Sequence, residues 1–187
     1  MGKVIIFSAP SGSGKSTIVN HLLGKFNKLE LSISATSRAP RGQEQNGREY
    51  YFISAEEFEK RIAQDRFVEY EQVYKGTYYG TLKDELERIW SAGHIITFDV
   101  DVKGGVNLKR IFGNDALSIF IQAPSIEELH RRLVARATDS EKAIEERVAK
   151  AAEEMKYAPM FDRIIINDEL DKAFECADSL IEEFIRK

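Results

Sequence analysis

The sequence predicts an α/β protein built on a five-stranded parallel sheet. Apolar runs recur between longer amphipathic stretches, at Val4–Phe7, Ile95–Phe98, Leu117–Ile121 and Ile164–Ile166. Short runs that are apolar throughout are typical of strands buried on both faces. A weaker, alternating run over 31–34 supplies a fifth strand, and the amphipathic segments supply the helical crossovers that parallel strands require.

Helix starts are marked by three capping boxes, in which a Ser or Thr side chain and a Glu three residues later bond each other's backbone N–H groups. They are Ser54-x-x-Glu57, Ser125-x-x-Glu128 and Thr138-x-x-Glu141. A final helix is predicted over 171–186, where apolar residues recur at helical spacing and form one core-facing stripe. That stripe consists of Phe174, Ala177, Leu180, Ile181 and Phe184.

The composition is that of a single folded domain. A chain of 187 residues can bury most of its apolar surface but is short for two independent cores. Hydrophobic residues at 43% and charged residues at 31% exclude a largely disordered, collagen-like or coiled-coil chain. A net charge of -4 gives no overall drive toward nucleic acid or an anionic membrane, so we expect neither as a partner. The sequence does not determine the oligomeric state.

Cysteine usage and the N-terminal segment favour a cytoplasmic protein. Cys176 is the only cysteine, which excludes an intramolecular disulfide framework and a Cys-based zinc site and suits a reducing compartment. The apolar run at Val4–Phe7 is too short for a signal peptide or a membrane span.

Two polar segments interrupt the alternation of strands and helices. Residues 37–81 are rich in Gly and Tyr and carry short alternating pieces at 50–53 and 66–74, so we expect an insertion on the main sheet. Residues 136–143 join two predicted helices and lie between clustered arginines. Charged connections of this kind are often mobile lids over a ligand site.

A phosphate-binding loop follows the first strand. The chain reads Ala9-Pro10-Ser11-Gly12-Ser13-Gly14-Lys15-Ser16-Thr17 and then continues as an amphipathic segment. In a P-loop the glycines let backbone N–H groups face phosphate oxygens, and the helix N-terminus adds the positive end of its dipole. Lys15 would reach the β- and γ-phosphates of a bound nucleotide, and Ser16 would hold Mg²⁺. Ala9 replaces the Gly of the strict pattern, which is acceptable if its φ is not positive.

A GTPase is the first alternative among P-loop proteins. The segment Asp101-Val102-Lys103-Gly104 fits the Asp-x-x-Gly that senses the γ-phosphate. A GTPase also needs Asn-Lys-x-Asp late in the chain to bind guanine. The nearest match, Asn27-Lys28-Leu29-Glu30, ends in Glu and precedes the second strand, so the GTPase interpretation is disfavoured.

A nucleotide kinase needs a second site that binds another phosphorylated nucleotide. Residues 34–51 supply suitable side chains, because Arg38 and Arg41 lie three residues apart and arginine can grip a phosphate with two N–H groups. The same stretch also carries Ser34, Arg48, Tyr50 and Tyr51.

Several segments resemble the guanylate kinase family in order and spacing. They are Ser34–Glu44, Asn46–Tyr50, Phe67–Glu69, Tyr78–Thr81 and Asp99–Gly104, and the resemblance continues to Ile164–Asp171. It implies a P-loop NTPase fold that transfers the γ-phosphoryl group of ATP to GMP or dGMP, giving ADP and GDP, with Mg²⁺ as cofactor. The implied regions are a core (1–36, 94–124 and 156–187), a GMP-binding region (37–93) and a helical lid (125–155).

The resemblance also implies a role for each matched residue. Arg38, Arg41 and Tyr50 would hold the GMP phosphate, and the guanine side of the pocket would be formed by Ser34, Glu69, Tyr79, Gly80 and Thr81. Asp99 and Asp101 match paired aspartates that serve GMP and the Mg²⁺–phosphate network, with their separate roles open; we assign Mg²⁺ to Ser16 and Asp99. The candidate catalytic residues are Lys15, Arg38 and the lid arginines Arg136 and Arg147.

A carboxylate suits recognition of guanine, because guanine presents N1–H and a 2-amino donor on one edge while adenine presents neither. Strand alternation over 67–74 places Glu69 on the same face as Phe67, Glu71 and Val73.

Two other functions stay open: a related P-loop kinase acting on another small phosphate ester, and a non-catalytic protein-binding module of the same fold. The second is disfavoured because Lys15 is present.

Overall fold

The computed structural model describes residues 2–135 and 140–187. The chain forms two compact units, one made of Met1–Leu29 with Thr97–Lys187 and the other of Glu30–Ile96. The chain passes from the first unit to the second within strand β2 (Leu29–Leu31) and returns within strand β7 (Ile95–Asp99). The division into core, GMP-binding region and lid stays a prediction.

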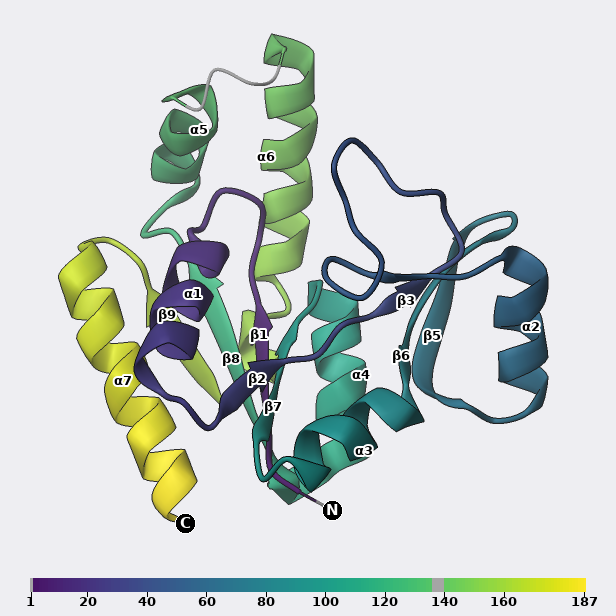
Figure 1. Ribbon diagram of the computed structural model, residues 1–187. Helices are drawn as coiled ribbons and strands as arrows, with labels where there is room; N and C mark the ends of the chain where they lie inside the picture. The colour runs from purple at the N-terminus through teal and green to yellow at the C-terminus, as the bar shows by residue number, and fades with distance from the viewer. Residues whose placement is uncertain (1, 136–139) are drawn as a thin grey trace. The chain divides into compact units, whose positions relative to one another are not determined.

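The expected five-stranded parallel sheet is confirmed, with the strand order β2-β7-β1-β8-β9 (Figure 1). Its other strands are β1 (Val4–Ser8), β8 (Ala116–Gln122) and β9 (Arg163–Ile166). The central strand β1 pairs with β8 along its whole length, from Val4 beside Ala116 to Ser8 beside Phe120. All of β1 is buried, as its uninterrupted apolar run predicts.

Strand β9 is not buried on both faces, contrary to the prediction from its apolar run. Ile165 is 1% exposed, whereas Ile164 and Ile166 are 44% and 56% exposed. The physical reason is position: β9 is an edge strand of the sheet, and its alternate side chains point to a face that is only partly covered. Apolarity alone does not distinguish an edge strand of this kind from a central one.

The second strand along the chain begins earlier than predicted. The structure places β2 at Leu29–Leu31, whereas the alternating pattern indicated residues 31–34. The N–H group of Ile33 donates to the side-chain carboxylate of Glu85 at 3.0 Å, so this backbone donor is bound outside the parallel sheet. Strand β3 (Ala35–Thr36) then belongs to a different sheet.

Helices cover both faces of the five-stranded sheet. Helices α1 (Lys15–Lys25) and α7 (Leu170–Arg186) pack against each other on one face, and α4 (Val102–Phe112) packs against β1 and β8 on the other (Figure 1). Helices α5 (Ile126–Ala135) and α6 (Glu141–Met155) pack together. Their small core consists of Ala123, Leu129, Leu133, Ile144 and Ala151, with Val148 against it.

Two of the three predicted capping boxes have the expected N-cap. The hydroxyls of Ser54 and Ser125 each accept the backbone N–H three residues later, at 3.1 Å. The third assignment was wrong, because α6 begins at Glu141 and its N-cap is Ser140, which accepts the N–H of Ala143. Thr138 lies outside the described residues. A Ser two positions later competes with Thr for the cap, and the sequence pattern does not decide between them.

The predicted stripe of α7 is partly wrong. The fully buried residues of this helix are Ala173, Ala177 and Ile181, spaced four apart. Phe174, Leu180 and Phe184 are only partly buried. The buried line of this helix therefore consists mainly of small Ala side chains, and the larger apolar residues lie along the edges of that line.

The second unit holds a four-stranded sheet with the order β4-β3-β6-β5. Besides β3, its strands are β4 (Tyr51–Phe52), β5 (Phe67–Tyr74) and β6 (Thr77–Leu82), so the alternating pieces predicted at 50–53 and 66–74 are both strands. Helices α2 (Ala55–Ala63) and α3 (Lys83–Ser91) complete the unit. Its core consists of Ala35, Phe58, Phe67 and Leu82, with Tyr51, Ile53, Ile62 and Tyr78 packed against it.

A register shift in β5 breaks the alternation expected for Glu69. Phe67 lies beside Leu82 and Glu69 beside Thr81, so β5 carries an extra residue at this point. The Phe67 ring lies 6.0 Å from the ring of Tyr70, a residue that simple alternation places on the opposite face. The prediction that Phe67 and Glu69 lie on one regularly alternating face is therefore wrong.

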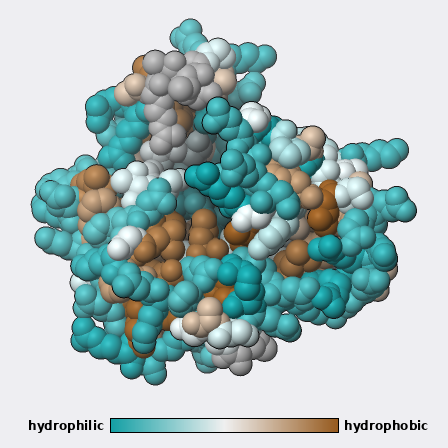
Figure 2. Space-filling model, in the orientation of Figure 1, coloured by the Kyte–Doolittle hydropathy of each residue, from teal (hydrophilic) through white to brown (hydrophobic). Residues whose placement is uncertain are grey.

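Among the described residues, no helix is long and apolar enough to cross a membrane. The face shown in Figure 2 is mostly hydrophilic, with hydrophobic side chains in separate patches.

The core of the second unit gives the first testable prediction. Phe58 is fully buried and stacks on the rings of Phe67 and Tyr78, at centroid distances of 4.2 and 5.1 Å. Phe58→Ala should lower the free energy of unfolding by about 3–5 kcal/mol, because it removes buried area and leaves a cavity. Denaturant titration of the full chain measures this change. The exposed neighbour Glu56 is the control, and Glu56→Ala should change stability by less than about 0.5 kcal/mol.

Candidate active site

The P-loop connects the buried strand β1 to helix α1. Gly12 and Gly14 have φ values of 92° and 86°, and Gly14 is the N-cap residue of α1 in the left-handed conformation. Among the described non-glycine residues, only Asp65 has a positive φ. Ala9 therefore meets the condition under which it can replace the Gly of the strict pattern.

Two side chains from distant elements contact the loop. The buried amide of Asn167 donates to the carbonyl oxygen of Ser13 at 2.8 Å, and a Cβ on Gly14 would overlap this amide. Arg147, on α6, donates to the hydroxyl of Ser11 at 3.3 Å. Asn167 received no role from the sequence, because its partner lies 154 residues away and only the fold brings the two together.

Lys15 is paired with groups at the end of β7 and directly after it. Its ammonium forms an ion pair with Asp99 and donates to the carbonyl oxygen of Val100 at 3.2 Å. Ser16 and Thr17, next on the chain, are exposed. The first unit thus brings together Lys15 and Asp99, two residues that the sequence predicted for the phosphate and metal network.

Asp101 occupies a different position from Asp99. Its carboxylate accepts the N–H of Gly104 at 2.8 Å and caps helix α4, while its carbonyl oxygen accepts the hydroxyl of Ser8. A capping carboxylate favours the helix N-terminus and is held in place by it. The two aspartates that the sequence left undivided therefore differ in their contacts: Asp99 pairs with a lysine and Asp101 caps a helix.

The donor set of the first unit fits a Mg²⁺ ion that also binds phosphate. Ser16 and Asp99 offer hydroxyl and carboxylate oxygens, which Mg²⁺ prefers, and Mg²⁺ in kinases is held by few protein ligands together with substrate phosphates. Residues 2–135 and 140–187 contain no group of three His, Cys, Asp or Glu side chains that could hold a metal ion by themselves.

In the second unit, Arg38 is the centre of a polar and aromatic cluster. Its Nη1 and Nη2 donate to the two carboxylate oxygens of Glu44 at 2.6 and 2.8 Å, and its Nε donates to the hydroxyl of Tyr79 at 3.0 Å. The guanidinium also lies 5.0 Å from the centroid of the Tyr50 ring. Three residues predicted for GMP binding, Arg38, Tyr50 and Tyr79, are thus side by side.

Glu44 links the two predicted phosphate-binding arginines. Besides pairing with Arg38, it accepts the backbone N–H of Arg41 at 2.8 Å, while the Arg41 residue is exposed. The hydrogen bonds from Arg38, and then the one from the Arg41 backbone, lower the pKa of Glu44 to about 2. The same pair raises the pKa of Arg38 above its ordinary value. The sequence alone gave no role to Glu44, although it lies inside the arginine-rich segment.

Three of the predicted guanine-side residues, Glu69, Gly80 and Thr81, meet where β5 pairs with β6. The buried hydroxyl of Thr81 donates to Glu69 at 2.7 Å. Gly80 has no room for a side chain, because a Cβ there would lie 2.7 Å from the Glu69 carbonyl oxygen and 2.9 Å from the Tyr70 Cβ. The carbonyl oxygen of Ser34 accepts the N–H of Tyr51 at 2.9 Å.

Arg136, predicted as a lid arginine, lies outside the described residues.

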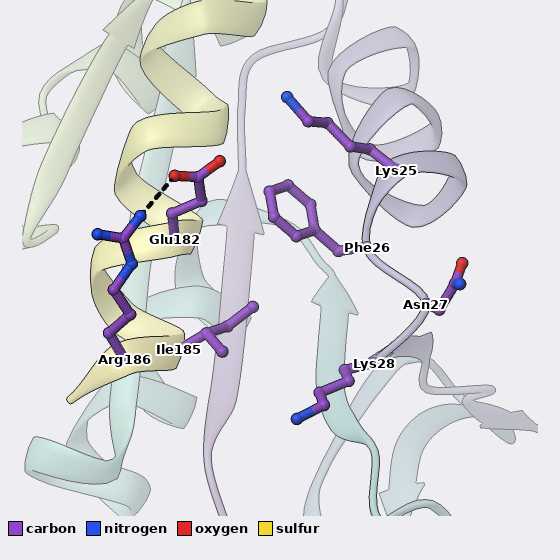
Figure 3. A pocket seen from close by; sticks show the side chains of 7 residues that line it. All are labelled: Lys25, Phe26, Asn27, Lys28, Glu182, Ile185 and Arg186. Carbon is purple, nitrogen blue, oxygen red and sulfur yellow. Dashed lines mark hydrogen bonds and ion pairs between the residues drawn. The ribbon is translucent and has the colours of Figure 1, made fainter.

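One pocket in the first unit is separate from all of these residues. Its volume is about 300 Å³, and it lies where α1 ends beside the last turn of α7. Figure 3 shows Phe26 and Ile185 beside the charged side chains of Lys25, Glu182 and Arg186, with the last two paired. None of the predicted nucleotide-binding residues lines this pocket.

The parallel sheet, the P-loop after its central strand and the arginine–tyrosine cluster define a P-loop nucleotide kinase. The sequence model of guanylate kinases matches residues 1–184. The chain therefore belongs to the guanylate kinase family.

Comparison with individual proteins agrees with this assignment. A guanylate kinase of Bacteroides fragilis is 56% identical over 183 residues, which cover 98% of this chain and 90% of the relative. One of Porphyromonas gingivalis is 54% identical over 188 residues, covering 100% of both chains. The crystal structure of a guanylate kinase from Anaplasma phagocytophilum superposes with a TM-score of 0.73 at 27% identity, over 97% of this chain and 85% of that one.

The pairing of Glu44 with Arg38 gives a prediction about acid. Because the folded-state pKa of Glu44 is about 2, below its ordinary value of 4.5, the pair stabilises the folded chain fully above pH 4.5 and is lost as the pH falls through 2. Carboxyl NMR should show Glu44 titrating near pH 2, and Arg38→Ala should move the midpoint toward 4.5. A wild-type midpoint near 4.5 would contradict the pairing.

Proposed function

We propose that the chain transfers the γ-phosphoryl group of ATP to GMP and dGMP, giving ADP and GDP or dGDP. The P-loop unit would bind ATP, and the Glu30–Ile96 unit would bind the acceptor nucleotide. The observation that carries the proposal is the content of the second unit, where a small sheet presents the Arg38 cluster and the Glu69–Thr81 pair. The Arg38 cluster suits a phosphate, and the Glu69–Thr81 pair suits the hydrogen-bonding edge of guanine.

The assignment of GMP-binding residues follows this chemistry. Arg38, Arg41 and Tyr50 would bind the GMP phosphate through cationic and hydroxyl donors. The guanine side would consist of Ser34, Glu69, Tyr79, Gly80 and Thr81, and we also assign Asp99 and Asp101 of the first unit to GMP. In this arrangement Glu69 accepts from guanine N1–H and the 2-amino group, while Thr81 already donates to Glu69 and helps to fix its carboxylate.

The first unit would hold ATP on the loop from Ala9 to Thr17. Lys15 would exchange its contact with Asp99 for the β- and γ-phosphates, leaving Asp99 and Ser16 as oxygen ligands for Mg²⁺. When bound, Mg²⁺ would neutralise charge on the phosphates. Arg147 already reaches the loop at Ser11, and we assign it, with Arg136, to the transferring phosphoryl group.

The reaction needs no general base. The acceptor is a phosphate oxygen that is mostly ionised at neutral pH, because a phosphomonoester has its second pKa near ~6. The histidines fit this expectation: His21 contacts Asp178, His94 contacts Glu30, and His130 is exposed. Catalysis would come from alignment and positive charge, supplied by Lys15 and the arginines. A cytoplasmic location remains a prediction.

Lys15→Ala tests the role of the P-loop lysine. The variant should lower kcat by at least about a hundredfold, as loss of a group that stabilises transition-state charge does. Circular dichroism should be unchanged, because the Lys15 side chain is partly exposed rather than in the core. Lys28→Ala, at an exposed lysine beyond the end of α1, is the matched control. Turnover of Lys15→Ala within a few-fold of wild type would refute the assignment.

Glu69→Gln tests guanine recognition. In this variant Thr81 can still donate to the Gln oxygen, so the new amide NH₂ would face the hydrogen-bond donors of guanine. A donor that faces another donor in this way costs about 1–3 kcal/mol. We expect kcat/KM for GMP to fall at least about tenfold, with no fall in the AMP rate. Glu71→Gln, two residues along the same strand, is the control.

IMP is the sharpest substrate for this test, because it keeps N1–H but lacks the 2-amino group. Wild type should prefer GMP to IMP clearly and should barely use AMP. Equal use of IMP and GMP by the wild-type enzyme would show that Glu69 does not accept two hydrogen bonds from guanine, even if GMP is the natural acceptor.

A further inference from the structure

Glu85, on helix α3, is a buried carboxylate that the proposed reaction does not use. The residue is only 3% exposed. A buried carboxylate is costly unless hydrogen bonds and an opposite charge compensate it. Glu85 has both, because its two oxygens accept four hydrogen bonds of 2.9–3.0 Å. The donors are the backbone N–H of Ile33, the hydroxyl of Tyr51, and Nε and Nη2 of Arg88.

Besides Arg88, Glu85 contacts Ile33 and Tyr51, and each of these is next in sequence to a proposed GMP-binding residue. Ile33 directly precedes Ser34, and Tyr51 directly follows Tyr50. The backbone joins these segments as well, because the N–H of Tyr51 donates to the carbonyl oxygen of Ser34. One carboxylate therefore connects the segment assigned to the guanine side with the segment assigned to the phosphate side.

Glu85 acts from the reverse side of β4. Side chains alternate along a strand, and here the guanidinium of Arg38 lies 5.0 Å from the ring of Tyr50 and 5.6 Å from that of Phe52. Tyr51, between them, directs its hydroxyl to Glu85 instead. A displacement of Tyr51 would thus move the backbone that carries Tyr50 beside Arg38.

The Tyr51 side chain packs against the core of the second unit and also borders a pocket. A pocket of about 370 Å³ opens beside it and is lined by Tyr51, Leu82, Glu85 and Arg88, among others. Tyr51 is only partly buried, so its hydrogen bond to Glu85 sets where its hydroxyl end lies. Arg88 in turn is held by Glu30, at 2.6 Å, and Glu30 also contacts His94.

We propose that Glu85 is a positioning residue for GMP binding, which holds the Ser34 and Tyr50 segments in register from the side of the strand opposite Arg38. This inference rests on the proposed function, because it takes Ser34 and Tyr50 as GMP-binding residues. It assigns no contact between Glu85 and the nucleotide. Its consequence is that loss of the Glu85–Tyr51 hydrogen bond weakens GMP binding selectively.

The test uses Glu85→Gln, Tyr51→Phe and the double variant of the full chain. Tyr51→Phe removes only a hydroxyl and keeps the ring, so it tests the hydrogen bond even if Glu85→Gln does not fold. We expect each single variant to raise KM for GMP about five- to tenfold, the latter being ~1.4 kcal/mol. KM for ATP and kcat at saturating GMP should stay within about twofold. Glu87→Gln, at an exposed glutamate of the same helix, is the control.

The double variant separates positioning from general destabilisation. If Glu85 acts through Tyr51, the two effects on KM for GMP should be non-additive, and the double variant should resemble the more impaired single variant. Additive effects, an unchanged KM for GMP in folded Tyr51→Phe, or equal changes for ATP and GMP would each overturn the inference. If wild type fails to phosphorylate GMP, the proposed function itself fails. If wild type uses GMP and the variants match it, only the role of Glu85 fails.

Discussion

The left-handed conformation of Gly14 is the constraint on which the phosphate-binding end of the first unit depends. It turns the chain from a fully buried strand directly into α1, and the first helical residue is Lys15. The amide of Asn167 fills the space that a side chain at Gly14 would need and also binds the adjacent Ser13 carbonyl. A residue other than Gly at this position would strain the backbone, and its side chain would also displace the amide of Asn167. The direction of α1, and with it the place of Lys15, follows from this turn.

Two of the cationic side chains proposed to bind phosphate are already paired with a carboxylate. Lys15 pairs with Asp99, and Arg38 pairs with Glu44. These carboxylates are partly exposed. A phosphate that replaced either carboxylate would carry more negative charge, so each cation would exchange one anionic partner for a stronger one. The pairing also keeps each side chain near its working position before a nucleotide arrives, which reduces the ordering that binding must impose.

The sequence predicted features that local patterns encode and missed those that need a distant partner. The apolar run of β1 and the P-loop are local, and both were predicted with correct positions. The exposure of Ile164 depends on its place at the edge of the sheet, which periodicity does not report. Glu85 contacts Ile33 across 52 residues of sequence, and Asn167 reaches Ser13 across 154. No spacing rule connects such pairs, because only the folded topology brings them together.

A phosphoryl transfer without a general base places unusual weight on geometry. If alignment and charge supply most of the rate, small displacements of the groups that hold either nucleotide reduce turnover without any loss of a reacting group. Asn167 and Glu85 are suited to prevent such displacements, and each acts inside one unit only. Substitution of Asn167 should therefore report on ATP, and substitution of Glu85 should report on GMP. That separation by substrate is the kinetic signature expected when each unit holds its own positioning residue.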